Sequence, residues 1–379
     1  MGLGLQSTDR SDFTLTDEQI DACDAIMEFV ENRDAGDAFV VHGLAGTGKT
    51  VLAAYVASEL ELHMMAPTGK AASNLRRKTR RNATTIHKIV YNLIDEKVRN
   101  RWGRIVTVPS FEGKSLAEVE LPYGAAVILD ECSMVNEETR EDIRRCGLRV
   151  IAFGDPGQLP PVSGKQGYPK PDFTLKEIHR QAQDSGIIVA AHAVRHGQPL
   201  VPNRDVRMVR DADLTPAELL NFGLVMCWTN KNRHALNAMM RGAAGHTSLL
   251  PRAGEPMLAL RNKYEIGMYN GAVYQLRQDI NPGDTYCVLD VDGTERTMQF
   301  AMGSWGQYTC GVKGAETMPL AERPVALDWG YALTVHKAQG SEERNVLLLE
   351  DMRRGSEDYP AWAYTALTRA SDKITIIRG

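Results

Sequence analysis

Residues 42–50 read His42-Gly43-Leu44-Ala45-Gly46-Thr47-Gly48-Lys49-Thr50 and satisfy the pattern G-x-x-x-x-G-K-[ST]. A short β-prone run, 39–41, precedes this stretch, and residues 51–60, rich in alanine and leucine, follow it. A glycine-rich turn between a strand and a helix directs backbone N–H groups toward an anion, which the positive end of the helix dipole also favours. The stretch therefore predicts a phosphate-binding loop, with Lys49 near the β- and γ-phosphates and the Thr50 hydroxyl on Mg²⁺.

The composition indicates a globular protein of several domains. The chain has 379 residues, of which 43% are hydrophobic, and its net charge of −4 requires any nucleic-acid contact to use a local basic groove. The six cysteines form no C-x-x-C pair, which argues against a disulfide framework or zinc ribbon and favours a reducing compartment. No apolar run approaches the ~20 residues of a membrane span, and the N-terminus has no signal pattern. We expect a cytoplasmic protein, in the bacterial host cytoplasm if it is phage-encoded.

Four apolar runs in the N-terminal half are predicted to be buried strands. The first precedes the phosphate loop. Signature segments that contain polar residues directly follow the other three, 62–66, 125–129 and 150–153. Because parallel strands place their carboxyl ends at one edge of a sheet, this pattern predicts an α/β fold with its site at that edge. Further buried strands are expected at 223–228, 329–333, 346–349 and 374–377.

Breaks in this pattern divide the chain into two α/β domains and two insertions. Residues 91–122 are charged and bear aromatic side chains, which predicts a small hairpin insertion. Residues 255–324 consist of short β-like runs separated by turn sequences such as Asn270-Gly271, which predicts a small all-β insertion. The first α/β domain is then expected to comprise residues 1–90 and 123–190, and the second 191–254 and 325–379.

Two further segments supply the chemistry that a nucleotide phosphate requires. Asp130-Glu131 offers one carboxylate to Mg²⁺ and a second that can activate water as a general base. Gln158 follows the next strand, where it could sense a γ-phosphate, and prolines fix the backbone after it. An acidic pair after a strand is by itself ordinary helix-capping chemistry, but the phosphate loop upstream favours the metal-binding interpretation. His192 and His196 lie four positions apart, as in the zinc-protease motif H-E-x-x-H, but Ala193 stands where that motif needs Glu. We therefore expect no metal site there.

At these residues the chain resembles superfamily 1 helicases, in the 5′-to-3′ branch that includes RecD-like and Dda-like enzymes. The matching segments keep the family's order along nearly the whole chain: 43–50, 66–72, 85–88, 130–134, 154–162, 175–181, 331–342 and 364–370. The resemblance implies a P-loop NTPase with two RecA-like parallel-sheet motor domains. It places the hairpin insertion (1B) in the first motor domain (1A) and an SH3-like β-barrel insertion (2B) in the second (2A).

The resemblance also implies ATP and Mg²⁺ as cofactors and assigns residues to them. The expected catalytic residues are Lys49, Glu131, Gln158 and two arginine fingers, Arg180 and Arg369. The expected nucleotide contacts are Gln19, Gly43, Ala45, Gly46, Thr47, Gly48, Lys49, Thr50, Gly340 and Glu342, and the expected metal ligands are Thr50 and Asp130. Guanidinium groups that reach across a cleft stabilise a transferring phosphate, so ATP binding would favour closure of the two motor domains.

Single-stranded DNA and its junction with duplex are the expected partners. The expected strand contacts are hydroxyls, imidazoles, cations and neighbouring loop residues that can meet phosphates: Pro67, Thr68, Lys70, Thr85, His87, Asn230, Thr334, His336 and Lys337. In the hairpin insertion, Trp102 or Phe111 could stack on a base or act as a wedge, or else form the insertion's own small core. We expect a monomer with no membrane contact, and a single-stranded-DNA-binding protein or a replisome component as a protein partner.

Together these features predict an ATP-dependent DNA helicase that moves 5′ to 3′ on single-stranded DNA and unwinds duplex in replication, recombination or repair. Three alternatives stay open: a translocase that displaces bound proteins, a motor acting on RNA, and a loader that uses ATP only as a switch. The presence of Glu131, Gln158 and both arginines argues against a pure switch. A small-molecule kinase would leave everything after residue 215 unexplained.

Overall fold

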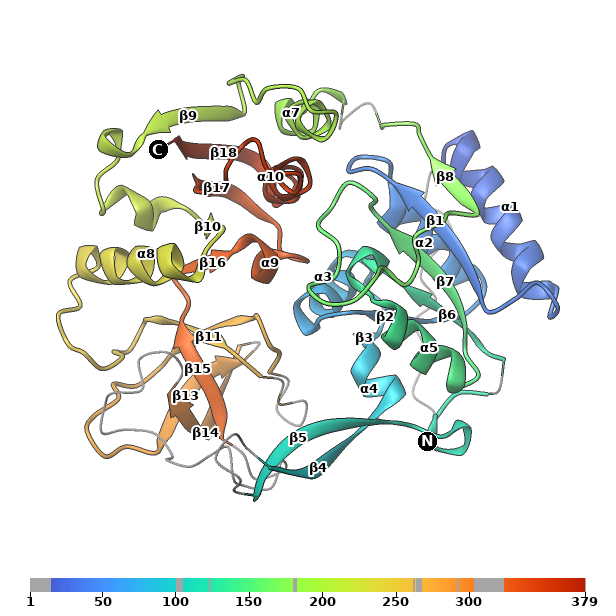
Figure 1. Ribbon diagram of the computed structural model, residues 1–379, viewed down its shortest axis with the longest axis horizontal. Coiled ribbons are helices and arrows are strands. Elements are labelled where there is room, and N and C mark those ends of the chain that lie inside the picture. The colour runs from blue at the N-terminus through green and yellow to red at the C-terminus, as the bar shows by residue number, and fades with distance from the viewer. Residues whose placement is uncertain are drawn as a thin grey trace.

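Two parallel sheets, a closed barrel and a hairpin make up the fold of the computed structural model (Figure 1). The structure describes residues 15–99, 105–122, 124–179, 183–261, 263, 268–291, 293–302 and 324–378. The two sheets lie side by side, and the barrel lies below the second sheet in the view of Figure 1. The predicted α/β fold with two RecA-like sheets and two β insertions is confirmed.

The first sheet has six parallel strands in the order β3-β2-β6-β7-β1-β8. The strands are β1 (Ala38–Gly43), β2 (His63–Ala66), β3 (Ala83–Thr85), β6 (Ala126–Leu129), β7 (Arg149–Gly154) and β8 (Phe173–Leu175). Its helices are α1 (Asp17–Glu31), α2 (Lys49–Glu59), α3 (Gly69–Thr79), α4 (Ile86–Val90) and α5 (Glu137–Arg145). Apolar clusters lie on its strands, and one of them also includes residues of α1 and α2. Because the central strands are buried on both faces, their sequences are nearly continuous apolar runs.

Helix α1 illustrates how local sequence sets the element boundaries. Thr16 and Gln19 form a capping box at its first turn, in which each side chain accepts a hydrogen bond from the other residue's backbone N–H. At its C-terminal end the guanidinium group of Arg149 donates to the carbonyl oxygens of Phe29 and Asn32, at 2.5 and 2.9 Å. These bonds satisfy carbonyls that a helix end leaves without partners.

The second sheet has five parallel strands in the order β16-β10-β17-β18-β9. The strands are β9 (Val206–Arg210), β10 (Leu224–Cys227), β16 (Ala332–Thr334), β17 (Glu343–Glu350) and β18 (Ala370–Arg378). Its helices are α7 (Gly186–Arg195), α8 (Asn230–Ala243), α9 (Val335–Ala338) and α10 (Tyr359–Leu367). Because α7 packs against α10, β9 and β18, residues 186–190 lie with this sheet, although the sequence analysis assigned them to the first α/β domain. Short 3₁₀ helices occur at Leu116–Glu118, Cys132–Met134, Asp211–Asp213 and Glu218–Asn221.

The barrel closes through five strands and has an apolar core of its own. The strands are β11 (Pro256–Ala259), β12 (Val273–Leu276), β13 (Tyr286–Val291), β14 (Thr294–Met302) and β15 (Val325–Trp329). Two buried ion pairs connect it to α8: Arg233 with Asp328 at 2.9 Å, and Arg241 with Glu255 at 2.6 Å. The barrel is therefore attached firmly to the second α/β domain.

One strand prediction is wrong, because residues 329–333 are divided between two sheets. Strand β15 ends the barrel at Trp329, and β16 starts in the second sheet at Ala332. Gly330 lies at the crossing, where a Cβ atom would come within 2.9 Å of Val273 Cγ1 and 3.1 Å of the Leu258 nitrogen. Only glycine lets the chain pass so close to the barrel wall.

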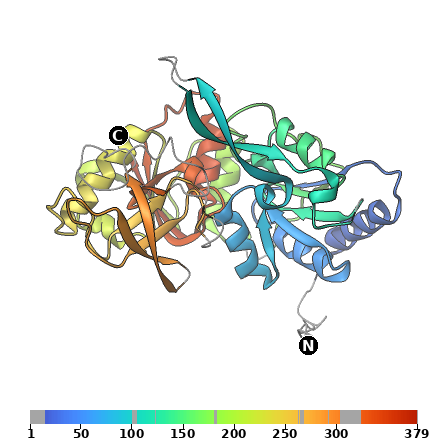
Figure 2. The same cartoon turned by 90° about the horizontal axis from the view of Figure 1, so that it is seen from below.

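The hairpin insertion pairs β4 (Tyr91–Arg99) with β5 (Ile105–Gly113) in antiparallel fashion. It projects from the first α/β domain as a two-stranded arm, which Figure 2 shows from below. Trp102 lies outside the described residues. Phe111 is opposite Leu93 in the strand register, and its side chain is outside the described part. Among the described residues, no helix is long and apolar enough to cross a membrane.

Candidate functional site

The phosphate loop connects β1 to α2 through backbone conformations that favour glycine. Gly46 and Gly48 have φ values of +88° and +75°, in the left-handed region that L side chains rarely adopt. A Cβ atom at Gly43 would lie only 2.5 Å from Thr47 Oγ1. Lys49 starts α2, and its ammonium group donates to the carbonyl oxygen of Gly43 at 2.6 Å. The Lys49 side chain therefore folds back over the loop, where a bound phosphate would also lie.

Gln19 reaches the end of this loop from α1. Its side chain is buried, and Nε2 donates to the Thr47 carbonyl oxygen at 3.3 Å. The same nitrogen lies 3.2 Å from His179 Nε2, whose backbone N–H donates to the Gly46 carbonyl oxygen. The structure thus places Gln19, one of the expected nucleotide contacts, beside the phosphate loop.

Residues of both α/β domains line one small cavity of about 80 Å³, which we call the inter-domain cavity. The first domain contributes Thr50, Asp130 and Glu131. The second contributes Gly340, Ser341, Glu342, Thr368 and Arg369. Helix α3 supplies Ala71, Asn74, Leu75 and Lys78. Six residues that the sequence analysis assigned to catalysis, nucleotide or metal therefore meet in one place, although up to 319 positions separate them in the chain.

The acidic side of the inter-domain cavity suits a divalent cation. Burial, with a contribution from the Glu131 carboxylate, raises the pKa of Asp130 to about 6, and the charges of Lys49 and Lys78 act in the opposite direction. A hydroxyl at Thr50 and carboxylate oxygens at Asp130 are the hard oxygen donors that Mg²⁺ prefers. Glu131 has a φ of +55°, an uncommon conformation for a residue with a side chain, and such residues cluster at functional sites.

Arg369 lies on the opposite side of the inter-domain cavity and is almost completely buried. Its guanidinium donates to the carbonyl oxygens of Thr365 and Ser341, at 3.1 and 3.2 Å. Within the described part of the chain, no carboxylate forms an ion pair with it. Gln158 Oε1 is buried and has no hydrogen-bond partner among the described residues. Arg180, the other expected arginine finger, lies outside them.

The sequence analysis missed two residues that connect the phosphate loop to the second α/β domain. The hydroxyl of Tyr364 accepts a hydrogen bond from the Ala45 backbone N–H and donates to Asp155 Oδ2, both at 2.7 Å. Tyr364 belongs to α10, and Asp155 follows β7. Both residues stand inside segments that matched the helicase pattern, at 364–370 and 154–162, so their positions were the available signal.

The expected DNA contacts gather at the carboxyl ends of neighbouring strands. Strand β2 pairs with β3, and β10 pairs with β16, so each domain brings two of the expected segments together. Thr68, Thr85 and Thr334 are the N-cap residues of α3, α4 and α9, and their hydroxyls accept backbone N–H groups. Capping is therefore a role of these threonines that the sequence analysis did not assign. Pro67 directly precedes the first of them.

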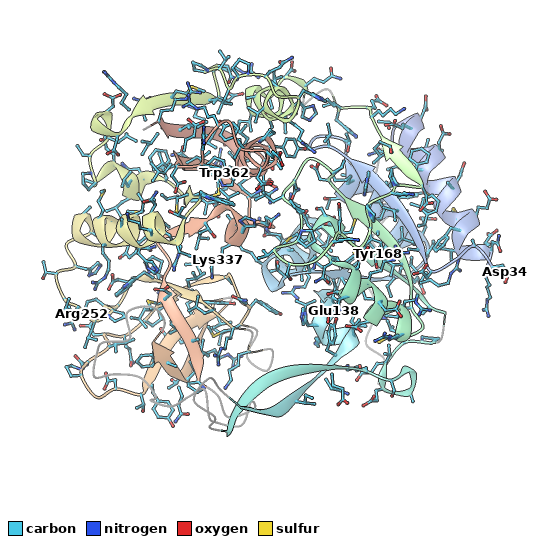
Figure 3. The ribbon with its side chains drawn as sticks, in the orientation of Figure 1. Asp34, Glu138, Tyr168, Arg252, Lys337 and Trp362 are labelled. Carbon is cyan, nitrogen blue, oxygen red and sulfur yellow. The ribbon has the colours of Figure 1, made fainter. Side chains whose placement is uncertain are left out.

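The remaining expected DNA contacts are partly buried, apart from an exposed Asn230. Burial lowers the pKa of His87, His336 and Lys337. The His336 ring packs on Trp228, with centroids 5.3 Å apart, and the Asn230 side chain accepts a bond from Arg233. Lys337 lies on α9, on the side of the second domain that faces α3 (Figure 3).

A cavity of about 690 Å³, here called the α3–barrel cavity, lies between α3, the second sheet and the barrel. Its walls include Lys70, Tyr269, Tyr331 and Glu343. Burial lowers the pKa of Lys70 to about 8, and the Glu343 carboxylate partly opposes this shift. Lys70 therefore holds a costly positive charge beside a large space.

The barrel touches the first α/β domain at the start of α3. A Cβ atom at Gly69 would fall 1.9 Å from the ring of Tyr269, so the tyrosine packs directly on the glycine. The Arg76 guanidinium lies 5.9 Å from the centroid of the same ring. Helix α3 thus contacts both the inter-domain cavity and the barrel.

Two family models match the chain. The model described as AAA domain matches residues 14–214, which is more than half of the chain. The model described as UvrD-like helicase C-terminal domain matches residues 330–377. Together the two models span the residues that line the inter-domain cavity.

Curated relatives and solved structures agree with these matches. The ATP-dependent RecD2 DNA helicase of Deinococcus radiodurans is 29% identical over 88% of this chain, which spans 46% of the RecD2 length. The RecBCD enzyme subunit RecD of Mycolicibacterium smegmatis is 25% identical over 92% of the chain and 71% of its own length. A Bacteroides Pif1 helicase, solved with ADP-AlF3 and single-stranded DNA, has a TM-score of 0.59 at 19% identity over 96% of this chain and 92% of its own. A Pif1 structure solved for unwinding at forked DNA has a TM-score of 0.61, also at 19% identity, over 97% and 92%. These matches confirm the predicted resemblance: the chain belongs to the AAA-domain family, and it is similar to RecD2 and RecD helicases in sequence and to Pif1 helicases in fold.

Proposed function

We propose that this protein is an ATP-dependent DNA helicase that moves 5′ to 3′ along single-stranded DNA and unwinds duplex, in replication, recombination or repair. The observation that carries this proposal is the inter-domain cavity. It joins Thr50, Asp130 and Glu131 of one domain to Arg369 of the other. Such an arrangement makes hydrolysis depend on how closely the domains approach, and that dependence is what a motor requires.

The proposed chemistry distributes roles across the two domains. Mg²⁺, held by Thr50 and Asp130, would neutralise phosphate charge, and Glu131 would accept a proton from the attacking water. Lys49 and Arg369 would stabilise the charge that develops on the transferred phosphoryl group. The unpartnered Oε1 of Gln158 supports a role in orienting that water or in sensing the γ-phosphate.

The proposed substrate rests on the relatives and on the strand ends. The relatives include a DNA helicase, and the Pif1 structures were solved with single-stranded or forked DNA. In this chain, Thr68 and Thr85 lie at one sheet edge, and Thr334 and Asn230 at the other. We propose that one strand crosses both edges, so that alternating closure of the domains moves the protein along it.

Unwinding of matched duplexes that carry either a 5′ or a 3′ single-stranded tail tests the proposal, with ATP turnover recorded in the same samples. We expect only the 5′-tailed duplex to open. Lys49→Ala and Glu131→Gln should abolish turnover, with Gly355→Ala as a matched control, because a Cβ atom at Gly355 has no neighbour within 4 Å. Near-normal turnover in either active-site variant would refute the assignment.

The same measurement separates the alternatives. DNA-stimulated turnover with both duplexes intact would replace the proposal with a translocase that displaces proteins. Stimulation by RNA but not by DNA would identify an RNA motor. ATP binding without multiple turnovers would identify a loader that uses ATP as a switch.

A further inference from the structure

A hydrogen-bonded cluster joins the phosphate loop to the interior of the second α/β domain. Tyr364 is fully buried in α10, and its hydroxyl lies between the Ala45 backbone N–H and Asp155 Oδ2, at 2.7 Å from each. Asp155 is 1% exposed, and its other oxygen accepts the Gly157 backbone N–H at 2.8 Å. One phenolic oxygen of the second domain therefore contacts both a backbone N–H and a carboxylate of the first domain.

The surroundings of Tyr364 show that the contact is closely fitted. A Cβ atom at Gly157 would lie 2.7 Å from the tyrosine ring, so only glycine leaves room for it. The His192 ring stacks on the tyrosine with centroids 6.3 Å apart, and its Nε2 lies 3.2 Å from the Ala45 carbonyl oxygen. Because a carbonyl oxygen only accepts, that nitrogen is the donor. Both backbone groups of Ala45 are thus held from the second domain.

The Tyr364 hydroxyl and the Lys49 ammonium group both approach the same carboxylate oxygen of Asp155. Lys49 Nζ lies 3.8 Å from Asp155 Oδ2, the same oxygen that Tyr364 occupies. Burial raises the pKa of Tyr364, so its hydroxyl keeps the proton that it donates to Asp155. A buried carboxylate that loses a donor attracts the nearest cation more strongly, because little water screens the pair.

We propose that Tyr364 is a positioning residue for nucleotide binding, which keeps the ion pair between Asp155 and Lys49 at its long separation of 3.8 Å and fixes the Ala45 segment of the phosphate loop. Without the hydroxyl, Lys49 closes on Asp155 and is withdrawn from the phosphates. The proposal rests on the proposed ATPase function, but binding of ADP tests it without the chemical step. It also makes nucleotide affinity depend on whether α10 is docked on the first domain.

The test measures equilibrium binding of a fluorescent ADP analogue, without DNA, together with kcat and KM for ATP. Tyr364→Phe should weaken binding on the order of tenfold, since it removes a hydrogen bond to a charged group. KM should rise and kcat should also fall, because Lys49 is the cation proposed to stabilise the transferred phosphoryl group. Tyr359→Phe is the matched control, because Tyr359 lies in the same helix and donates to Glu350, away from the phosphate loop.

A second substitution distinguishes positioning from simple packing. In Tyr364→Phe combined with Asp155→Asn, the charge that competes for Lys49 is gone, so affinity for ADP should return toward the wild-type value. Asp155→Asn alone should bind ADP at least as tightly as the wild type, and this variant tests the proposal even if Tyr364→Phe fails to fold.

Three results would overturn the inference: unchanged affinity in Tyr364→Phe, weaker binding in Asp155→Asn, or a double variant as weak as Tyr364→Phe. Each is distinct from failure of the proposed function. A protein that binds ADP but opens no duplex would refute the helicase proposal and leave the Tyr364 inference intact.

Discussion

Gly340 is the position where the loop before β17 presses on α3, and its replacement by alanine gives a sharp test of domain closure. Its φ is +74°, and an added Cβ atom would lie 2.9 Å from Ala71 Cβ and 3.1 Å from Ala71 Cα. These atoms belong to a helix and cannot rotate away. Gly340→Ala keeps the backbone groups of residue 340, so any direct nucleotide contact through them is preserved.

The two costs of the substitution appear in different measurements. Placing alanine in the left-handed conformation costs about 1–2 kcal/mol whether the domains are open or closed, so it lowers the unfolding temperature. Overpacking against Ala71 costs about 1–3 kcal/mol and arises only when the domains are together. At about 1.36 kcal/mol per factor of ten, the overpacking reduces turnover by about 5-fold to 150-fold.

Gly245 provides the matched control for the backbone strain. Its φ is +84°, and a Cβ atom there would have no neighbour within 4 Å. Both alanine variants should therefore lose similar thermal stability, while only Gly340→Ala loses ATP turnover with single-stranded DNA at saturating concentration. Equal turnover in the two variants would show that the contact between Gly340 and Ala71 does not limit closure, and the reasoning would fail.

Three further predictions concern the barrel and α3. Asp328→Asn leaves the buried Arg233 guanidinium without its charge partner and should destabilise the protein by about 3–5 kcal/mol in chemical unfolding. Asp372 forms an exposed ion pair with Arg344, so the control variant Asp372→Asn should leave the unfolding midpoint unchanged. Gly69→Ala and Tyr269→Ala should each undock the barrel from α3, and the double variant should increase the radius of gyration in X-ray scattering no further than either one. Lys70 has a folded-state pKa lowered to about 8, so its charge destabilises the fold below pH 8, and this cost disappears as pH rises toward the unfolded value. Lys70→Met should therefore raise the unfolding temperature at pH 7 and have little effect near pH 10, and equal gains at both values would contradict the argument.

Those parts of the site that depend on local sequence were predictable. Gly46, Gly48 and Lys49 follow from a turn whose geometry needs glycine at fixed spacing. Asp130 and Glu131 follow from a buried strand that ends in carboxylates. In both cases a few adjacent residues determine the backbone and the chemistry together, so the sequence of this chain alone is sufficient to predict these site residues.

The contacts between the domains were not predictable in the same way. Tyr364 meets Ala45 across 319 positions, and no periodic pattern encodes such a pairing. The threonines show a different kind of failure. A threonine directly before a helix predicts an N-cap, so the capping roles of Thr68 and Thr334 could be predicted from the sequence beside their expected DNA contact. The division of residues 329–333 could not be predicted, because Gly330 indicates a crossing only when the barrel wall beside it is known.

Helix α3 connects the proposed nucleotide site to the proposed DNA path. On one side it meets the second domain, through Asn74, which donates to the Gly340 carbonyl oxygen, and through Lys78, which pairs with Glu342 at 2.5 Å. At its start it meets Tyr269 of the barrel, next to the cap residue Thr68. Buried ion pairs attach the barrel to α8, so the barrel and the second domain approach α3 as one body. Opening of the inter-domain cavity must therefore also withdraw Tyr269 from the end of β2. Each proposed nucleotide cycle would then change the surroundings of Thr68, a proposed DNA contact, and the barrel would need no separate hinge.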